Sequence, residues 1–185
     1  MKLPSAPTSQ TDVISEGCQD KFGKTLIIYY SLSNNTKEIA RLIQRQTGAA
    51  LHEIKTIRSY PAIPEVYRIA EIELSEGPLP ELASAIPDLN GYDFIFVGGP
   101  VWVYTLTPAL LSFFRIADFH GKLVVPFCTH QGGYGNFFAR FPKEVQNANI
   151  LGGQDFYYVL RQSTDKLEKQ ISAWLKSLPG AAVKI

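Results

Sequence analysis

Cysteine and histidine are scarce in this sequence, and each scarcity excludes a class of site. The 185 residues include two cysteines, Cys18 in a polar segment and Cys128 at the end of an apolar run. Two such thiols do not indicate a disulfide framework. The three histidines, His52, His120 and His130, lack the spacing of metal ligands. We therefore expect no metal site, and we expect Cys128 to be a buried thiol.

Excess charge of one sign is also missing. Lysine and arginine total 18 and aspartate and glutamate total 17, so the net charge is +1, and the basic residues are scattered along the chain. This pattern argues against a nucleic-acid partner. A hydrophobic fraction of 45% and a charged fraction of 19% are ordinary for a soluble globular protein. The length suits one domain, which we expect over residues 23–185.

The first residues lack the apolar core of a signal peptide. They contain Pro4, Pro7 and several Ser and Thr, and their longest apolar pair is Val13-Ile14. We expect residues 1–22 to be a mobile tail and the protein to be cytoplasmic, unless a natural leader was removed ahead of this sequence.

One charge-free run, residues 94–114, is long enough to cross a membrane. Gly98-Gly99-Pro100 and Thr107-Pro108 would break a membrane helix twice. The run is better interpreted as a buried strand, a loop and a buried helix, and we expect no membrane partner.

The stretch around residues 24–38 carries the strongest local signal. An unbroken apolar and aromatic run over 24–30 is typical of a central parallel strand. It is followed by the polar turn 31–36 and then by a periodic helical segment. The unpaired N–H groups at the start of such a helix predict an anion site. The alternative is an ordinary capping box, with Asn35 as N-cap and Glu38 reaching back.

Strands and helices alternate along the rest of the chain. Strands are expected over 49–57, 92–97, 122–128 and 154–160. Four helices are expected: one over 65–76, one that starts at 107, a short one that follows the loop 129–136 and ends at about 147, and one that starts at 163 or 164. This alternation predicts an α/β protein with a doubly wound parallel sheet and helices on both faces. Pro126 cannot donate to a ladder, so it predicts a local break in the hydrogen bonding of its strand.

Ligands bind at the carboxyl ends of the strands of such sheets, so three loops are candidates. The first is a cradle of hydroxyls and amides, the second presents two aromatic side chains, and the third is rich in glycine. The candidate binding residues are Ser31, Ser33, Asn34, Asn35 and Thr36; Pro100, Val101, Trp102, Val103 and Tyr104; and Thr129, His130, Gly132, Gly133 and Tyr134. A phosphate at the first loop and a flat ring between the other two would satisfy all three. The alternative is that these aromatics pack on their own helix and the glycines only make turns.

These motifs resemble the flavodoxin family, including flavodoxin-like proteins of bacteria, over residues 24 to about 178. The matches lie in residues 31–36, 92–102 and 121–130. The resemblance implies FMN as cofactor and a five-stranded sheet of order 2-1-3-4-5 in a three-layer α/β/α fold. The family usually has Gly where Asn34 stands, and often a second Trp and a Gly where Val103 and Tyr104 stand. It therefore stays open whether Trp102 or Tyr104 covers the flavin ring.

The charges expected around the three loops bear on whether the protein is a reductase, an electron carrier or a binding module. The three loops contain no Asp or Glu, and Lys37 and His130 are expected close by. Because reduced FMN is negatively charged, this site should tolerate it. We interpret the chain as a two-electron reductase that takes electrons from NAD(P)H and passes them to quinones or similar small acceptors; no catalytic residue is assigned. A one-electron carrier with a redox partner and an FMN-binding module without turnover are the alternatives. An esterase built on Ser31 or Ser33 with His130 is weaker, because no acid in those loops could orient the histidine.

Overall fold

A computed structural model describes residues 21–75 and 77–181. Its centre is a parallel sheet of β1 (Thr25–Tyr29), β2 (Ala50–Glu53), β3 (Phe94–Trp102) and β5 (Asp118–His130), with β6 (Gln146–Ile150) and β7 (Gln154–Tyr157) at one edge. The strand order is β2-β1-β3-β5-β6, and β7 also pairs with β5. The two-residue β4 (Thr105–Leu106) pairs antiparallel with β3. The predicted fold class and order are therefore confirmed, with β4 as an additional short strand.

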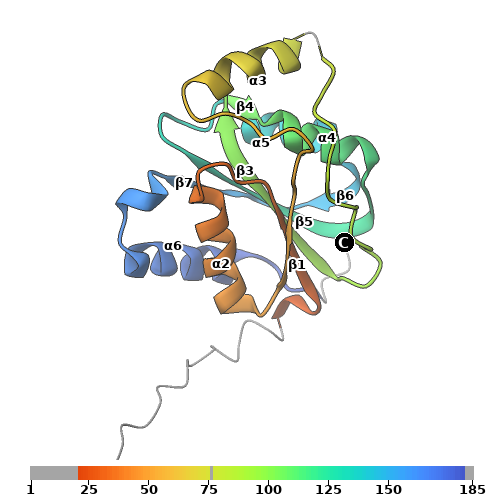
Figure 1. Cartoon of the computed structure of the whole chain (residues 1–185). Helices are drawn as coiled ribbons and strands as arrows, with labels where there is room; N and C mark the ends of the chain where they lie inside the picture. The colour runs from red at the N-terminus through yellow and green to blue at the C-terminus, as the bar shows by residue number, and fades with distance from the viewer. Residues whose placement is uncertain (1–20, 76, 182–185) are drawn as a thin grey trace, which may run out of the picture.

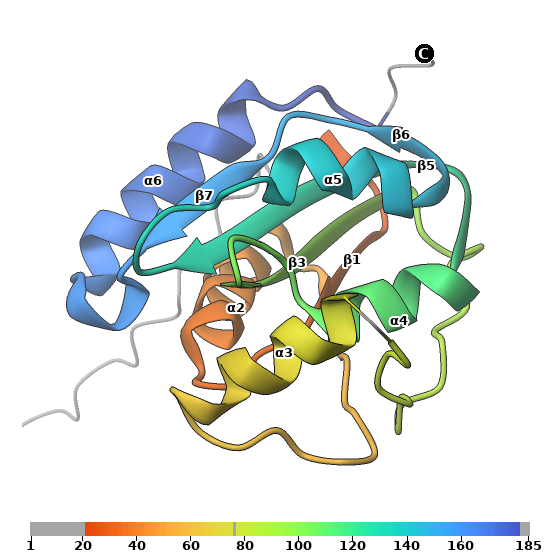
Figure 2. The ribbon, with the colours of Figure 1, turned by 90° about the horizontal axis from the view of Figure 1, so that it is seen from above.

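Helices cover both faces of this sheet (Figures 1 and 2). Buried side chains of α2 (Asn35–Thr47) and α6 (Thr164–Ser177) share one core cluster, and those of α3 (Glu65–Ser75), α4 (Pro108–Ile116) and α5 (Phe137–Glu144) share another. The strands feed both clusters, because successive side chains point to opposite faces. In β3, for example, Ile95 and Val97 join one cluster while Phe94 and Phe96 join the other.

The edge of the sheet differs from the expected single strand over 154–160. β6 pairs with β5 as far as Val124, and β7 resumes the pairing at Phe127. The interruption lies opposite Pro126, which has no N–H to give. The predicted break in hydrogen bonding at this proline is confirmed. Strand β6 was not predicted from the sequence, because its residues are polar and partly exposed.

The start of the domain adds one contact to the core. Of the expected tail, residues 1–20 lie outside the described residues, whereas Lys21 and Phe22 are described. Phe22 is fully buried against Phe94 and Phe96. The packed part of the domain thus includes these two residues, which the sequence analysis assigned to the tail.

The charge-free run 94–114 folds as β3, β4 and part of α4, as expected. No helix within the described ranges is long and apolar enough to cross a membrane.

Candidate functional site

The register of the central strands brings the three predicted loops to one edge of the sheet. Tyr29 of β1 is paired with Gly98 of β3, and Gly98 is paired with Phe127 of β5. All three strands run in the same direction, so the segments that follow them emerge side by side (Figure 1).

The first loop turns sharply at Asn34, the N-cap of α2. Asn34 has φ 63° and ψ −4°, the left-handed region that asparagine tolerates better than most residues. Its side chain makes no capping hydrogen bond. The Oγ of Ser31 instead accepts from the backbone N–H of Lys37 at 3.2 Å. The capping box from Asn35 to Glu38 is therefore wrong, because the helix begins one residue earlier and Ser31 supplies the cap.

This arrangement leaves donors at the helix start unused. The backbone N–H groups of Asn35 and Thr36 have no partner among the described residues. The Nδ2 of Asn35 donates to the Ser33 Oγ at 2.9 Å, which holds both side chains at the mouth of the loop. Free N–H groups and the positive end of the helix dipole suit a bound anion.

A buried hydrogen bond joins the first loop to the third. The hydroxyls of Thr36 and Thr129 lie 2.8 Å apart, and both side chains are buried. Thr36 therefore fixes the distance between two loops, and its hydroxyl faces Thr129.

The second loop is a β-hairpin. Val101 and Trp102 of β3 pair with Leu106 and Thr105 of β4, and the two residues of the turn are Val103 and Tyr104. Their φ angles are 49° and 57°. Two-residue turns of this kind favour Asn-Gly, and a β-branched residue at positive φ is strained. Strain of this kind is found at functional sites held by surrounding structure.

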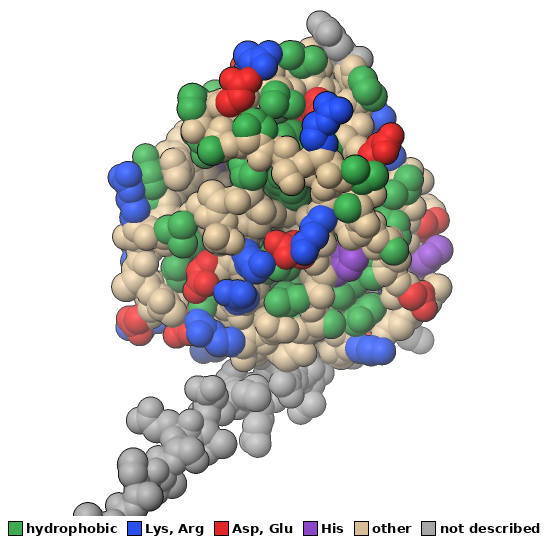
Figure 3. Space-filling view, viewed as in Figure 1, with side chains coloured by type: hydrophobic (Ala, Val, Ile, Leu, Met, Phe, Trp, Pro, Cys, Tyr) green, Lys and Arg blue, Asp and Glu red, His purple; other side chains and the backbone are tan. Residues whose placement is uncertain are grey.

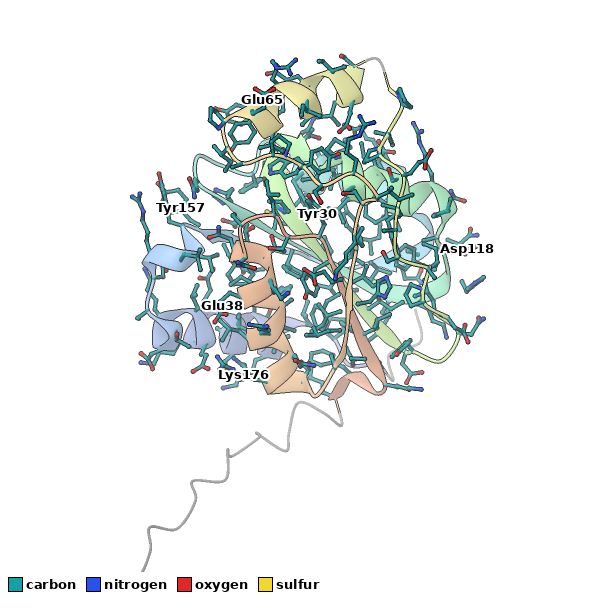
Figure 4. All side chains as sticks on the ribbon, in the orientation of Figure 1. Tyr30, Glu38, Glu65, Asp118, Tyr157 and Lys176 are labelled. Carbon is teal, nitrogen blue, oxygen red and sulfur yellow. The ribbon has the colours of Figure 1, made fainter. Side chains whose placement is uncertain are left out.

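The two aromatic candidates of this hairpin have different surroundings. Trp102 is 2% exposed, and its ring packs edge-on against Tyr60 at 5.0 Å and Tyr30 at 5.6 Å between centroids. Tyr30 is itself buried, in the core cluster that includes the buried side chains of α3, and it is labelled near the centre of the molecule in Figure 4. Tyr104 is 69% exposed at the tip.

The third loop is organised by His130 at the end of β5. Its Nδ1 accepts from the backbone N–H of Gly133 at 2.9 Å, so that nitrogen carries no proton. Its Nε2 lies 3.0 Å from the Oδ2 of Asp155 in β7 and donates to it. The neutral Nε2-protonated imidazole thus ties the glycine-rich loop to a carboxylate on the neighbouring strand.

The glycines of this loop have two roles. A Cβ at Gly132 or Gly133 would meet nothing within 4 Å, so both face open space. A Cβ at Gly135 would overlap the carbonyl oxygen of Tyr104, which accepts from the Asn136 N–H at 2.9 Å. Gly135 therefore holds the hairpin tip close to the third loop.

The loops enclose a groove, which we define as two adjoining hollows of about 40 and about 360 Å³. The smaller hollow lies at the first loop and the larger at the hairpin tip. The predicted residues that line the groove are Ser33, Asn35, Pro100, Val101, Trp102, Val103, Tyr104, Thr129, His130, Gly132 and Gly133. The predicted residues Ser31, Asn34, Thr36 and Tyr134 are in the loops but do not line it.

Helix α3 completes the groove with residues that the sequence analysis missed. Tyr67 lines both hollows and Glu71 lines the larger one. Their spacing of four places them on one helical face, beside the buried Val66 and Ala70. That spacing was visible in the sequence, but nothing in it indicated that α3 would cross over to the loops.

The charges of the site differ from those expected. Glu71 from α3 lines the larger hollow, and Asp155 from β7 contacts His130 although it does not line the groove itself. Lys37, which was expected close to the site, forms an ion pair with Glu53 at 3.3 Å. The expectation of a site without carboxylates is therefore wrong, because acidic residues arrive from elements outside the three loops.

His130 does have an acidic partner, which bears on the weaker alternative of an esterase. Asp155 does orient His130, although no loop contains an acid. Both imidazole nitrogens are nevertheless engaged, one by Asp155 and one by the Gly133 N–H. No nitrogen is free to take a proton from Ser31 or Ser33. Cys128 is fully buried, and burial and the charge of Asp155 raise the pKa of its thiol, which disfavours the reactive thiolate.

Comparison with known proteins agrees with this geometry. The sequence model of a family described as flavodoxin matches residues 24–176. Flavodoxin 1 of Salmonella typhimurium strain LT2 is 30% identical over 139 residues, which are 69% of this chain. The match spans 65% of the length of that flavodoxin.

The chain is also similar in sequence and fold to solved structures, including one of a flavoprotein. A flavoprotein from Lactobacillus acidophilus NCFM, solved in complex with FMN, is 26% identical, with a TM-score of 0.66, and the match covers 71% of this chain and 92% of that one. A protein from Bacteroides eggerthii DSM 20697 is 25% identical, with a TM-score of 0.69, and the match covers 87% of this chain and 99% of that one.

The strained hairpin generates a prediction about stability. Val103→Asn should raise the free energy of unfolding by about 1 kcal/mol, because asparagine accepts positive φ with less strain. Asn34→Ala is the matched control, because it places a residue with a Cβ and no polar group at another positive φ. It should lower the free energy of unfolding by about 1 kcal/mol. Urea unfolding followed by circular dichroism measures both. Destabilisation by Val103→Asn would show that the turn is not strained at Val103.

Proposed function

The chain belongs to the flavodoxin family, and on this premise we propose that it is an FMN-binding redox protein whose flavin lies in the groove. One observation carries the proposal. Backbone N–H groups without partners at the start of α2 lie at one end of an open groove, and an exposed aromatic residue, Tyr104, lies at the other end. FMN has the same two parts, a phosphate and a flat ring.

The residues of the first loop fit a phosphate. Ser33 and Asn35 offer a hydroxyl and an amide, and the N–H groups of Asn35 and Thr36 are unused by the described part of the chain. No Lys or Arg lines the groove within the described residues. The phosphate would thus be held by hydrogen bonds and the helix dipole rather than by an ion pair.

The residues at the other end fit a planar ring. Gly132 and Gly133 leave room for close approach of the backbone, and Tyr67 supplies an apolar face from α3. Of the two aromatic candidates, we propose Tyr104 as the one that covers the ring. Its exposure at the tip supports this choice, whereas Trp102 is already packed against Tyr30 and Tyr60.

Bound FMN would supply one-electron and two-electron transfer, and the chain would supply its position and its electrostatic surroundings. His130 fixes the Gly133 N–H and keeps Asp155 engaged, so one of the two nearby carboxylates is held in a hydrogen bond. Glu71 is exposed, and its carboxylate has no hydrogen-bond partner among the described residues, although its backbone carbonyl accepts from the Ser75 Oγ. It is therefore the group best placed to disfavour added negative charge in the groove.

Our finer proposal is a reductase that takes two electrons from NAD(P)H and passes them to quinones or similar small acceptors. An open groove with an exposed rim at Tyr104 leaves space for a second planar molecule, which supports this activity. The surface also carries intermingled positive and negative side chains over the face in Figure 3, rather than a large area of one sign that would steer a protein partner.

A second candidate is a one-electron carrier, and a specific observation favours it. Carboxylates near a flavin lower its potential, and Glu71 and Asp155 lie at this site. Steady-state oxidation of NADH and NADPH with a benzoquinone as acceptor distinguishes the two candidates. Turnover on the order of 1 s⁻¹ or faster is expected for the reductase, and its absence with a flavin-loaded protein would leave the carrier.

The phosphate assignment predicts a difference between two flavins. Ser33→Ala should weaken FMN binding about tenfold, because one hydrogen bond to a charged group contributes about 1.5–3 kcal/mol. Riboflavin binding should be unchanged, since riboflavin lacks the phosphate. Tyr104→Ala is the control and should weaken both flavins alike. Quenching of flavin fluorescence measures each affinity, and equal loss for both flavins in Ser33→Ala would remove Ser33 from the phosphate site.

The position of Glu71 predicts a shift of redox potential. Glu71→Gln should raise the midpoint potential of the bound flavin by on the order of tens of millivolts, because a nearby negative charge is removed. The matched control is Glu65→Gln, on the same helix but outside the groove. Spectroelectrochemical titration of the wild type and both variants measures the potentials. Equal potentials in Glu71→Gln and wild type would mean that Glu71 does not act on the ring.

A further inference from the structure

A second cavity of about 430 Å³ lies beneath α3 and shares no lining residue with the groove. Its walls are residues 57–61, one side of α3 and residues 78–81. We call it the α3 cavity. Its volume falls within the range of small-molecule sites.

The α3 cavity is adjacent to the groove through one aromatic contact. Tyr60 lines the α3 cavity, Trp102 lines the smaller hollow of the groove, and their ring centroids lie 5.0 Å apart. Tyr30 contacts both rings, at 6.2 Å from Tyr60 and 5.6 Å from Trp102. The two spaces are thus separated by packed aromatic side chains.

Polar groups converge on one end of this cavity. The Tyr60 O–H donates to the Glu73 Oε2 at 2.6 Å. The other carboxylate oxygen of Glu73, Oε1, has no hydrogen-bond partner in the described part of the chain. Burial raises the pKa of Glu73 and of Tyr60, although the charge of Arg58 acts in the opposite direction on Glu73. The cost of keeping this carboxylate half-buried would fall if a ligand donated a hydrogen bond to it.

Much of the remaining lining is apolar, and Arg58, Ser59 and Glu81 add polar side chains. Ile69 lines one wall from α3, and Pro61, Pro78, Leu79 and Pro80 come from the two loop segments. Proline rings and aliphatic side chains offer flat apolar contact and no further donors from their side chains. The carboxylates of Glu73 and Glu81 disfavour an anion, and the guanidinium of Arg58 disfavours a cation, so the polar lining favours a neutral donor.

We propose that the α3 cavity binds a small, uncharged hydroxy-aromatic molecule, with its ring against Ile69 and the prolines and its O–H donating to the Glu73 Oε1. This is a site separate from the flavin groove. It does not depend on whether the flavin acts as a reductase or as a carrier.

Fluorine NMR tests the proposal with 4-fluorophenol as the probe and the full chain loaded with FMN. The fluorine signal should shift saturably, with a dissociation constant of about 1 mM or lower, which is typical of so small a ligand. Ile69→Trp should abolish binding by filling the cavity. Glu73→Gln should weaken it about fivefold, since a hydrogen bond to a neutral amide is weaker than one to a carboxylate. The control Glu65→Gln, at the exposed start of the same helix (Figure 4), should bind as the wild type does.

Two matched probes separate this proposal from simpler explanations. Fluorobenzene lacks the hydroxyl and should bind at least fivefold more weakly than 4-fluorophenol. The cation 4-fluorobenzylamine should also bind more weakly. Equal binding of fluorobenzene, tighter binding of the amine, or unchanged binding in Ile69→Trp would each overturn the proposal. Circular dichroism checks that every variant folds. If Ile69→Trp does not fold, the comparison of Glu73→Gln with the wild type still tests the proposal.

Discussion

The register of the parallel strands is the constraint on which the site depends. Tyr29, Gly98 and Phe127 are paired in one line across the sheet, and Phe127 is also paired with Gln154 of β7. Side-chain direction alternates along each strand, so a slip by one residue would exchange its two core faces. The tight packing at Gly98, where a Cβ would overlap the Phe127 ring, opposes such a slip. The edge at which all three loops meet is thus fixed by the core.

Hydrogen bonds between the loops then set the shape of the groove. The bond between Thr36 and Thr129 joins the first loop to the third, and the bond from the Asn136 N–H to the Tyr104 carbonyl joins the third to the hairpin. His130 adds the link to Asp155. Because each loop is bound to another, the positive φ angles at Val103 and Tyr104 are imposed by the surroundings rather than by their own preferences.

Charges from outside the three loops contribute to the electrostatic surroundings of the flavin groove. Each loop contains only residues that are close in sequence, whereas the potential at a bound ring depends on every charge within several ångströms. Glu71 of α3 lines the groove, and Asp155 of β7 is hydrogen-bonded to His130, which lines it, whereas the three loops contain no carboxylate. The choice between reductase and carrier therefore rests on side chains that the crossover of α3 and the edge strand bring in. The aromatic residues Tyr30, Tyr60 and Trp102 likewise come from three segments to separate the groove from the α3 cavity.

The sequence by itself determined most of the helices and strands, although not β4 and β6, and it indicated the family and the three loops. Apolar runs such as 24–30, polar turns such as 31–36 and the break at Pro126 are local signals, because burial and backbone chemistry act on neighbouring residues. Only the tertiary structure decided that Ser31 rather than Asn35 caps α2, that Trp102 is buried while Tyr104 is exposed, and which acids reach the groove. These outcomes depend on contacts between residues far apart in the chain, such as His130 with Asp155. No local pattern encodes such a contact, since it forms only when packing brings separate elements together.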